Sequence, residues 1–199
     1  MIDISKNFKE KNPTILEIGV KKGGSLEMWN HYFDNECTIY GIDKYKSSEI
    51  VPGILEVDNI HIYIGLQQDR DFWDRFKKET PKFDIVIDDG GHRMNHQIVT
   101  LECIYDRIKD DGVYLCEDVH TSYWKSHGGG LKKPSSFIEY TKNLIDELNA
   151  YHVRENDDPY DKQKGDLTFR QTTNSIHYYD SIVVLEKELD LDKPCCSIR

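Results

Sequence analysis

The stretch TILEIGVKKGGSLEMWNHYF, residues 14–33, decides the fold because glycines join a short apolar run to an amphipathic segment. Residues 14–20 have the length and composition of a buried strand, and residues 24–33 repeat apolar side chains at helical spacing. Glycine lets the backbone approach a ligand closely, and the free N–H groups at the start of a helix can bind an anionic group. The stretch therefore predicts a strand–turn–helix unit with a ligand at its turn.

The same alternation of strand-like and helix-like segments continues along the chain. Strand-like runs occupy residues 14–20, 38–43, 61–65, 83–88 and 112–118, and helix-like segments occupy residues 24–33, 69–79, 96–108 and 133–151. This order predicts βαβ units on a parallel sheet. Residues 175–187 then hold two short β-rich runs around a turn at Tyr179, Asp180 and Ser181. We therefore expect an α/β fold, a Rossmann-like, doubly wound and mostly parallel sheet with an antiparallel strand near the C-terminus.

Length and charge narrow the class of protein. A chain of 199 residues suits a single domain, residues 1–199. The formal charge of −10, from 36 acidic and 26 basic residues, argues against nucleic acid as a partner. No apolar run approaches the roughly 20 residues of a membrane span, and the start lacks the apolar core of a signal peptide. We expect a cytoplasmic protein without a membrane partner, and a homo-oligomer stays open.

The five cysteines predict no metal or redox motif. Cys37, Cys103 and Cys116 are scattered singly and suit small buried apolar positions in a reducing compartment. Cys195 and Cys196 lack the C-x-x-C spacing of a zinc or redox site, so we assign them no role.

Acidic residues stand at the ends of most predicted strands. In open α/β sheets ligands bind outside the carboxyl ends of the strands. The acids at these ends are Glu17, Asp43, Asp88, Asp89, Glu117 and Asp118. We expect them to converge on one rim of the sheet.

The first two strand ends favour a nucleoside cofactor. The glycine turn departs from G-x-G-x-x-G because Lys21 occupies the second glycine position, so a plain β-to-α turn is the alternative. Asp43 follows roughly 20 residues later, where an acid can accept hydrogen bonds from ribose hydroxyls. Together they do not distinguish a dinucleotide from S-adenosylmethionine.

Five motifs together resemble a known family. They are E-x-G-x-x-x-G-G-S (17–25), GIDKY (41–45), GLQQD (65–69), VIDDGGH (86–92) and EDVHTSYW (117–124). Between Thr14 and Lys187 the sequence is similar to the class I S-adenosylmethionine-dependent methyltransferases. More narrowly, it resembles the magnesium-dependent sugar O-methyltransferases of the mycinamicin and macrocin type. The pairing of D-x-x-H with E-D-x-x-T-x-Y-W is the most specific part of this resemblance.

The resemblance implies that S-adenosylmethionine and Mg²⁺, or Mn²⁺, are the cofactors. The implied cofactor-binding residues are Gly19, Gly23 and Ser25 around the methionine moiety, Asp43 at the ribose, and Gln67 and Asp69 near the adenine. Glu17 and Asp88 are two further candidate cofactor-binding residues, and Asp88 could meet the amino group of the cofactor. Leu66 stands where an acid is common, which departs from the family pattern. The acceptor implied is a small molecule that carries a sugar hydroxyl.

The resemblance also implies that Asp89, Glu117 and Asp118 hold the metal, with Asp89 and His92 as the catalytic pair and His92 as the base. Three carboxylates without cysteine form a hard oxygen site suited to magnesium, manganese or calcium. If a helix begins at the glycines, Asp89 and His92 point toward the same rim. Binding to a cation would stabilise the alkoxide of a sugar hydroxyl, which is otherwise a poor nucleophile.

Several alternatives stay open. Asp88 or Asp89 could cap a helix that starts near Gly91, and Glu117 and Asp118 could be a solvated pair. His92 and His96 have the i,i+4 spacing of two zinc ligands, although H-E-x-x-H is absent. The chain could then be a metal-dependent hydrolase that uses Asp89, His92, His96 and Glu117, or a catalytically silent adenosyl-binding protein.

Tyr123 and Trp124 are the candidate substrate residues. They precede three consecutive glycines, residues 128–130, in a segment suited to a mobile cover over a substrate. The alternative is that both rings belong to the core.

Overall fold

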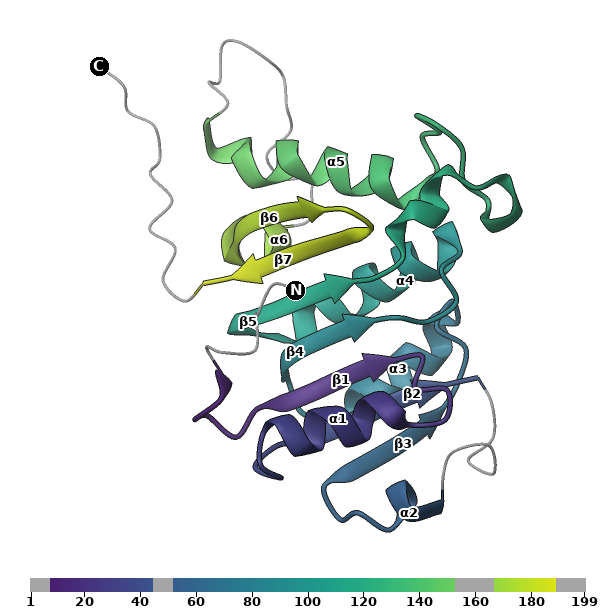
Figure 1. Cartoon of the computed structure of the whole chain (residues 1–199). Helices are drawn as coiled ribbons and strands as arrows, with labels where there is room; N and C mark the ends of the chain where they lie inside the picture. The colour runs from purple at the N-terminus through teal and green to yellow at the C-terminus, as the bar shows by residue number, and fades with distance from the viewer. Residues whose placement is uncertain (1–7, 45–51, 153–166, 189–199) are drawn as a thin grey trace.

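Seven strands form one sheet in the computed structural model, which describes residues 8–44, 52–152 and 167–188. The strands are β1 (Thr14–Ile18), β2 (Thr38–Asp43), β3 (Ile60–Ile64), β4 (Phe83–Asp88), β5 (Ile108–Cys116), β6 (Thr173–Tyr179) and β7 (Ile182–Lys187). Their spatial order is β3-β2-β1-β4-β5-β7-β6 (Figure 1). The first five pair in parallel, whereas β7 is antiparallel to both β5 and β6. The predicted Rossmann-like fold class is confirmed.

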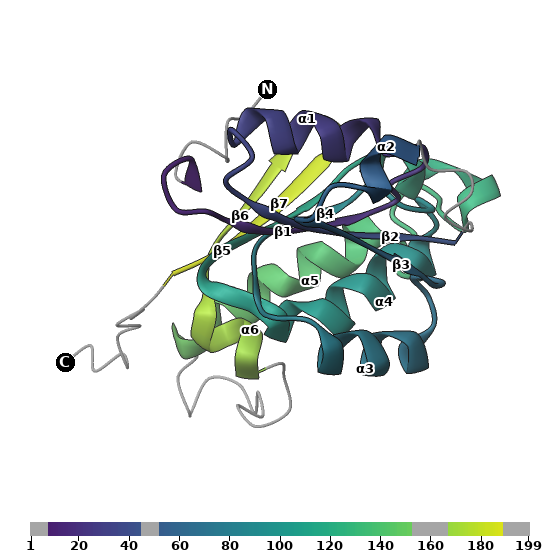
Figure 2. The same ribbon diagram turned by 90° about the horizontal axis from the view of Figure 1, so that it is seen from below.

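Helices cover both faces of this sheet (Figure 2). They are α1 (Gly24–Tyr32), α2 (Pro52–Leu55), α3 (Arg70–Glu79), α4 (Met94–Ile104), α5 (Phe137–Asn149) and α6 (Leu167–Thr172). The first two lie on one face, and α3 to α6 lie on the other. Among the described residues, no helix is both long and apolar enough to cross a membrane.

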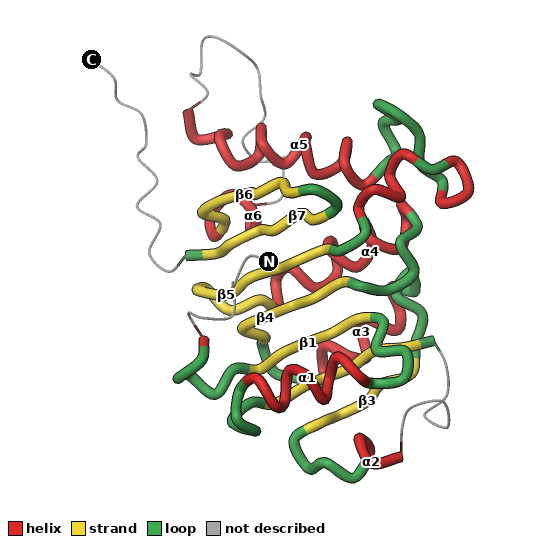
Figure 3. Tube along the Cα trace, in the orientation of Figure 1, coloured by secondary structure: helices red, strands yellow, loops and turns green. Residues whose placement is uncertain are grey.

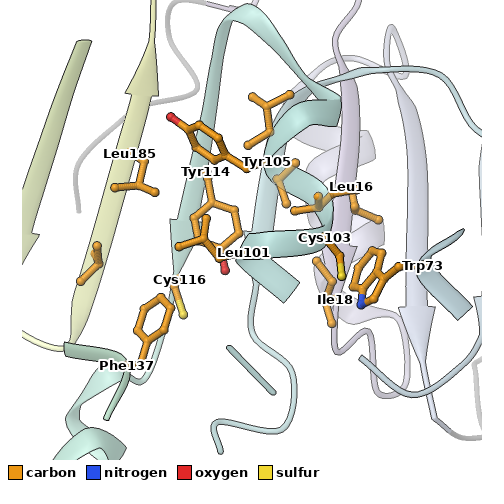
Figure 4. Packing of buried hydrophobic residues seen from close by; sticks show 14 of the residues in the cluster. Leu16, Ile18, Trp73, Leu101, Cys103, Tyr105, Tyr114, Cys116, Phe137 and Leu185 are labelled. Atoms are coloured by element: carbon orange, nitrogen blue, oxygen red, sulfur yellow. The ribbon is translucent and has the colours of Figure 1, made fainter. Parts of the chain in front are cut away.

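The larger part of the core fills the space between the sheet and α3, α4 and α5. Trp73 and Leu101 extend from the helices toward Leu16, Tyr114 and Leu185 of the strands (Figure 4). All five side chains are buried, at no more than 3% exposure. Burial of each large apolar side chain stabilises the fold by about 1.5–3 kcal/mol. The strand ends that carry the polar residues are therefore held by a rigid framework.

Several predicted boundaries were wrong by a few residues, among them three strand ends. β1 ends at Ile18 and not at residue 20, because Gly19 turns the chain with a φ of 94°. β5 begins at Ile108, four residues before the predicted start, and pairs with β4 through a register shift between Phe83 and Ile85. β5 also ends at Cys116, because Asp118 has a left-handed backbone with a φ of 53°.

Two short helices, α2 and α6, were absent from the sequence prediction. The short helices α2 and α6 have four and six residues, too few to show an amphipathic repeat. Ser136 is the N-cap residue of α5, and its side chain accepts a hydrogen bond from the backbone N–H of Glu139 at 3.3 Å. Cys37, Cys103 and Cys116 are buried free thiols, as expected, whereas Cys195 and Cys196 lie outside the described residues.

Candidate active site

A cavity of about 690 Å³ lies at the carboxyl ends of the parallel strands. The loops that follow β4 and β5 lie side by side at this end of the sheet (Figure 3). The cavity has the size of a small-molecule site, for which about 300–1,000 Å³ is typical. The predicted site residues in its wall are Gly19, Asp43, Gln67, Asp89, His92 and Asp118. The structure thus brings together acids from three strand ends, as the parallel topology predicts.

Gly19 lets two strand-end loops approach each other closely. A Cβ at this position would lie 2.2 Å from the Asp89 carbonyl oxygen, closer than any real Cβ contact. The Gly19 N–H donates to the Ile42 carbonyl at 2.8 Å, and the Asp89 N–H donates to the Ile18 carbonyl at 3.0 Å. Only glycine fits this position, so the glycine in the E-x-G motif has a steric reason.

Asp43 ends β2 at the wall of the cavity and is 9% exposed. Its Oδ2 accepts a hydrogen bond at 2.8 Å from the backbone N–H of Lys21, which has a left-handed φ of 51°. This bond fixes the carboxylate beside the glycine turn. The position suits the predicted contact with ribose hydroxyls, which donate to a carboxylate.

Glu17 and Ser25 lie beneath the glycine turn and do not line the cavity. Glu17 is 2% exposed, the Ser25 hydroxyl donates to its Oε1, and the Trp29 Nε1–H donates to its Oε2 at 3.1 Å. Burial, followed by the charges of Asp89 and Glu117, raises the pKa of Glu17 to about 7. Gly23 directly precedes α1 as its N-cap residue and has a left-handed φ of 89°. The structure gives these residues a role in shaping the turn, and their cofactor contacts stay predictions.

Asp88 and Gln67 form a buried network behind the cavity. Asp88 is 1% exposed and accepts hydrogen bonds from Gln67 Nε2 at 3.0 Å, the Tyr114 hydroxyl at 3.2 Å and the Gly90 N–H at 3.3 Å. Burial raises the pKa of Asp88. Gln67 also accepts the Gly91 N–H through Oε1. Gln67 therefore connects the loop after β3 to the loop after β4, whereas Asp88 does not line the cavity.

Asp69 caps a helix. It precedes α3, and its side chain accepts the Asp71 N–H at 3.0 Å. The cavity wall includes Gln67 but does not include Asp69. The predicted contact of Asp69 with adenine therefore has no geometric support here and stays a prediction.

Asp89, His92 and Asp118 converge into one cluster. His92 Nε2 lies 3.9 Å from Asp89 Oδ1 and 3.7 Å from Asp118 Oδ2, and one ligand atom from each residue lies within 4.8 Å of the others. The condition set for this convergence, a helix that begins at the glycines, is not met, because α4 begins at Met94. His92 instead has a left-handed φ of 49°, and this backbone turn brings its ring toward the two acids.

The helix-cap alternative for Asp88 and Asp89 is also wrong. The residue at the start of α4 is Arg93, which makes no side-chain cap hydrogen bond. His96 lines the cavity but is not part of the cluster, so the structure does not bring the four proposed hydrolase residues together in one metal site. Burial, followed by the charge of Arg93, lowers the pKa of His96.

The acids of the cluster repel one another. Burial, followed by the charges of Asp118 and Asp88, raises the pKa of Asp89 to about 6. Burial, followed by the charges of Asp89 and Asp118, raises the pKa of the neighbouring Glu117. Neighbouring carboxylates whose charged forms are disfavoured fit a divalent cation, which would relieve the repulsion. Glu117 lies close to the cluster of Asp89, His92 and Asp118 but outside it, so its predicted role as a ligand stays a prediction.

Tyr123 and Trp124 are surface residues, so the alternative that they belong to the core is wrong. Their exposed fractions are 51% and 49%. Tyr123 ends a short 3-10 helix, Val119–Tyr123, that starts directly after Asp118. The Trp124 ring lies edge-on between His120, at 4.7 Å, and His127, at 5.4 Å. Both rings are available to a substrate, and their role in binding it stays a prediction.

Three cations in the cavity wall were not assigned from the sequence. They are Lys21, Lys44 and Arg93. Lys21 stands at an unspecified position of E-x-G-x-x-x-G-G-S, Lys44 lies within GIDKY, and Arg93 directly follows VIDDGGH. The motif spacing assigned a role to none of them. Lys21 lowers the pKa of Asp89 through its charge, which opposes the larger upward effect of burial.

Comparison with known proteins finds sugar O-methyltransferases among the relatives of this chain. No protein-family model matches the chain. The chain is 32% identical over 183 residues to 8-demethyl-8-(2-methoxy-alpha-L-rhamnosyl)-tetracenomycin-C 3'-O-methyltransferase of Streptomyces olivaceus, a match that covers 87% of this chain and 44% of the relative. It is 28% identical over 194 residues to mycinamicin VI 2''-O-methyltransferase of Micromonospora griseorubida, covering 92% of this chain and 45% of the relative.

A solved structure agrees with these relatives. The MycE methyltransferase from the mycinamycin biosynthetic pathway, in complex with Mg and SAH, superposes with a TM-score of 0.79 at 28% identity. The match covers 94% of this chain and 48% of that one. In sequence and in fold, the chain is a relative of the S-adenosylmethionine-dependent sugar O-methyltransferases. A further MycE structure, with Mg, SAH and mycinamycin VI, has a TM-score of 0.78 at 27% identity and covers 94% of this chain and 47% of that chain.

The chain spans about half the length of the relatives it matches, between 44% and 48%.

Proposed function

We propose that the chain transfers the methyl group of S-adenosylmethionine to a sugar hydroxyl of a glycosylated small molecule, with the help of a divalent cation. One observation carries the proposal. A cavity lined by Gly19 and Asp43 is continuous with the cluster of Asp89, His92 and Asp118 at the same rim. The residues proposed for the nucleoside and those proposed for the metal therefore line one cavity.

The cofactor would bind over the ends of β1, β2 and β3. Gly19 lines the cavity at the turn after β1, Asp43 would accept hydrogen bonds from the ribose, and Gln67 would contact the adenine end. The N–H of Lys21 holds the Asp43 carboxylate in place before the ligand arrives. A carboxylate already fixed in position loses less conformational entropy on binding.

Asp89 and Asp118 would hold the cation, with Glu117 as a further oxygen donor. When bound, Mg²⁺ or Mn²⁺ would stabilise the negative charge that develops on the acceptor oxygen. His92 Nε2, beside both acids, would accept the hydroxyl proton. The acceptor oxygen forms a bond to the methyl carbon as the carbon–sulfur bond breaks, and an ether and S-adenosylhomocysteine are the products.

The acceptor class is inferred from the relatives. The names of two of them specify rhamnosyl tetracenomycin and mycinamicin VI as substrates, and one structure contains mycinamycin VI. We infer a glycosylated macrolide or polyketide for this chain. The exposed rings of Tyr123 and Trp124 would offer a flat apolar surface beside the cluster. The proposal does not depend on whether the chain forms a homo-oligomer.

Methyl transfer to a panel of deoxysugar glycosides tests the proposal. The protein would be incubated with S-adenosylmethionine and each glycoside, with and without Mg²⁺, and products would be followed by mass spectrometry. We expect a Mg²⁺-dependent product one methylene heavier, and its loss in His92→Ala. An intact glycoside in every reaction, with a protein that binds neither S-adenosylmethionine nor Mg²⁺, would contradict the proposal.

A further inference from the structure

We propose that Thr121 is a positioning residue whose hydroxyl joins the loop after β4 to the loop after β5 and so holds His92 beside Asp118. The inference rests on the proposed function, because that function needs the two side chains together. Thr121 is outside the cofactor, metal and base residues named above, and its own side chain is 2% exposed.

The Thr121 hydroxyl contacts the backbone of both site residues. Oγ1 donates to the His92 carbonyl at 2.8 Å and to the Asp118 carbonyl at 2.9 Å. The Thr121 N–H also donates to the Asp118 carbonyl, at 3.1 Å. A hydroxyl has one proton, so the two carbonyls share it as a three-centre hydrogen bond. The Thr121 side chain thus connects the loop after β5 to the loop after β4, where His92 lies 29 residues earlier in the sequence.

Hydrogen bonds to the carbonyls of His92 and Asp118 matter because both residues have an unfavourable backbone conformation. His92 and Asp118 have φ values of 49° and 53°, in the left-handed region that L-residues rarely adopt. The direction of a carbonyl is set by the ψ angle of its residue, which is 32° at Asp118. A donor that fixes both carbonyls therefore opposes relaxation of both residues toward ordinary conformations. The separation of 3.7 Å between His92 Nε2 and Asp118 Oδ2 depends on those two conformations.

Other contacts hold the end of β5 but do not join these two residues. Gln97 Nε2 donates to the Glu117 carbonyl at 3.2 Å, and the Val119 N–H donates to the Ser181 carbonyl at 3.0 Å. Each fixes a neighbour of Asp118 and leaves His92 untouched. Within the part of the chain that the structure describes, Thr121 is the side chain that bonds the backbone of both His92 and Asp118.

Substitution at Thr121 and titration with Mg²⁺ alone test the inference. Thr121→Val replaces the hydroxyl with a methyl group of similar size, and Thr121→Ser keeps the hydroxyl. Loss of a group that orients metal ligands typically lowers metal affinity by about 10- to 100-fold, and we expect that loss in Thr121→Val. We expect Thr121→Ser to keep the wild-type affinity. In the methyl-transfer assay, Thr121→Val should lower kcat while the KM for S-adenosylmethionine is unchanged.

Thr80→Val is the matched control. Thr80 is also buried, and its hydroxyl donates to a backbone carbonyl, that of Phe76 at 2.8 Å, but it lies at the end of α3. We expect this variant to lose thermal stability without losing Mg²⁺ affinity. Thr121→Ala removes the hydroxyl without pressing a methyl group on the carbonyls, and it replaces Thr121→Val if the valine variant does not fold.

Crystal structures without metal supply an independent readout. In the hydroxyl-free variant we expect His92 or Asp118 to leave the left-handed region and the Nε2–Oδ2 separation to exceed the present 3.7 Å. An unchanged separation together with wild-type Mg²⁺ affinity would overturn the role of Thr121. If the wild-type protein binds no Mg²⁺, the metal in the proposed function is wrong, and the crystal structures alone decide the role of Thr121.

Discussion

Three residues at the rim have backbone angles that sequence patterns do not reveal. Lys21, His92 and Asp118 have φ values between 49° and 53°, and each follows a strand of the parallel sheet within five residues. Non-glycine residues seldom adopt this region, and those that do cluster at functional sites. The residue types at the rim could be predicted from sequence. How they meet could not, because the prediction assumed that a helix began at the glycines.

Gly19 offers the sharpest steric test at the residue scale. Gly19→Ala would place a Cβ 2.2 Å from the Asp89 carbonyl, at a φ of 94° that alanine rarely adopts. We expect a loss of about 1–3 kcal/mol in the free energy of unfolding, together with weaker binding of S-adenosylmethionine. Chemical denaturation and calorimetry measure the two effects.

Gly24→Ala is the control for this variant. No atom lies within 4 Å of a Cβ at Gly24, and the residue begins α1. We expect it to be neutral or slightly stabilising, by up to about 1 kcal/mol. Equal effects of the two substitutions would show that the β1 turn and the loop after β4 are not in the described contact.

Glu17 predicts a pH dependence of stability. Its pKa is raised from 4.5 to about 7 in the folded state, chiefly by burial. The folded state therefore favours the protonated form, and this stabilising contribution is complete below about pH 4.5 and is lost as the pH rises through 7. We expect Glu17→Gln to lack this loss, which is on the order of 2–3 kcal/mol.

Urea denaturation of the metal-free wild type and of Glu17→Gln measures the difference in their free energies of unfolding. The pH range of 4.5 to 7.5 spans the ordinary and the raised pKa of Glu17. The exposed acid of α1, Glu27, supplies the control variant Glu27→Gln. Parallel stability curves for wild type and Glu17→Gln would contradict the prediction.

At the scale of elements, the helices and strands that have a clear apolar pattern could be predicted from the sequence. The five parallel strands and the covering helices α1, α3, α4 and α5 were predicted because each repeats apolar residues at its own period. The early start of β5 was missed because Lys109, Asp110 and Asp111 interrupt the apolar run, although they belong to the strand on either side of a register shift. Tertiary pairing decides such a boundary, and a single sequence does not contain it.

Asp69 separates a structural role from a ligand role. As the N-cap of α3 it accepts the Asp71 N–H, so Asp69→Ala should cost about 0.5–2 kcal/mol of stability. We expect the affinity for S-adenosylmethionine to stay at the wild-type value, since Asp69 is not in the cavity wall. Calorimetric titration of S-adenosylmethionine into Asp69→Ala and into Gln67→Ala compares the two affinities, and we expect Gln67→Ala to bind more weakly. A loss of affinity in Asp69→Ala as large as in Gln67→Ala would restore the predicted adenine contact.

At the scale of the whole molecule, the topology explains why distant motifs form one site. Parallel strands place all their carboxyl ends at one edge, so acids that are up to 75 residues apart, Asp43 and Asp118, line one cavity. That convergence was predictable from the order of the elements. Which of these acids line the cavity and which have structural roles was not predictable from the sequence. Glu17, Asp69 and Asp88 accept hydrogen bonds from other groups of the protein.

The central claim is that S-adenosylmethionine binds in this cavity through Asp43, apart from the acids proposed to hold the metal. Calorimetric titration of S-adenosylmethionine into metal-stripped protein tests it most directly, with Asp43→Asn and Asp118→Asn as paired variants. The account predicts one saturable site per chain, weakened about tenfold or more in Asp43→Asn by loss of charged hydrogen bonds and unchanged in Asp118→Asn. Absence of saturable binding in the wild-type protein, or equal losses in the two variants, would contradict it.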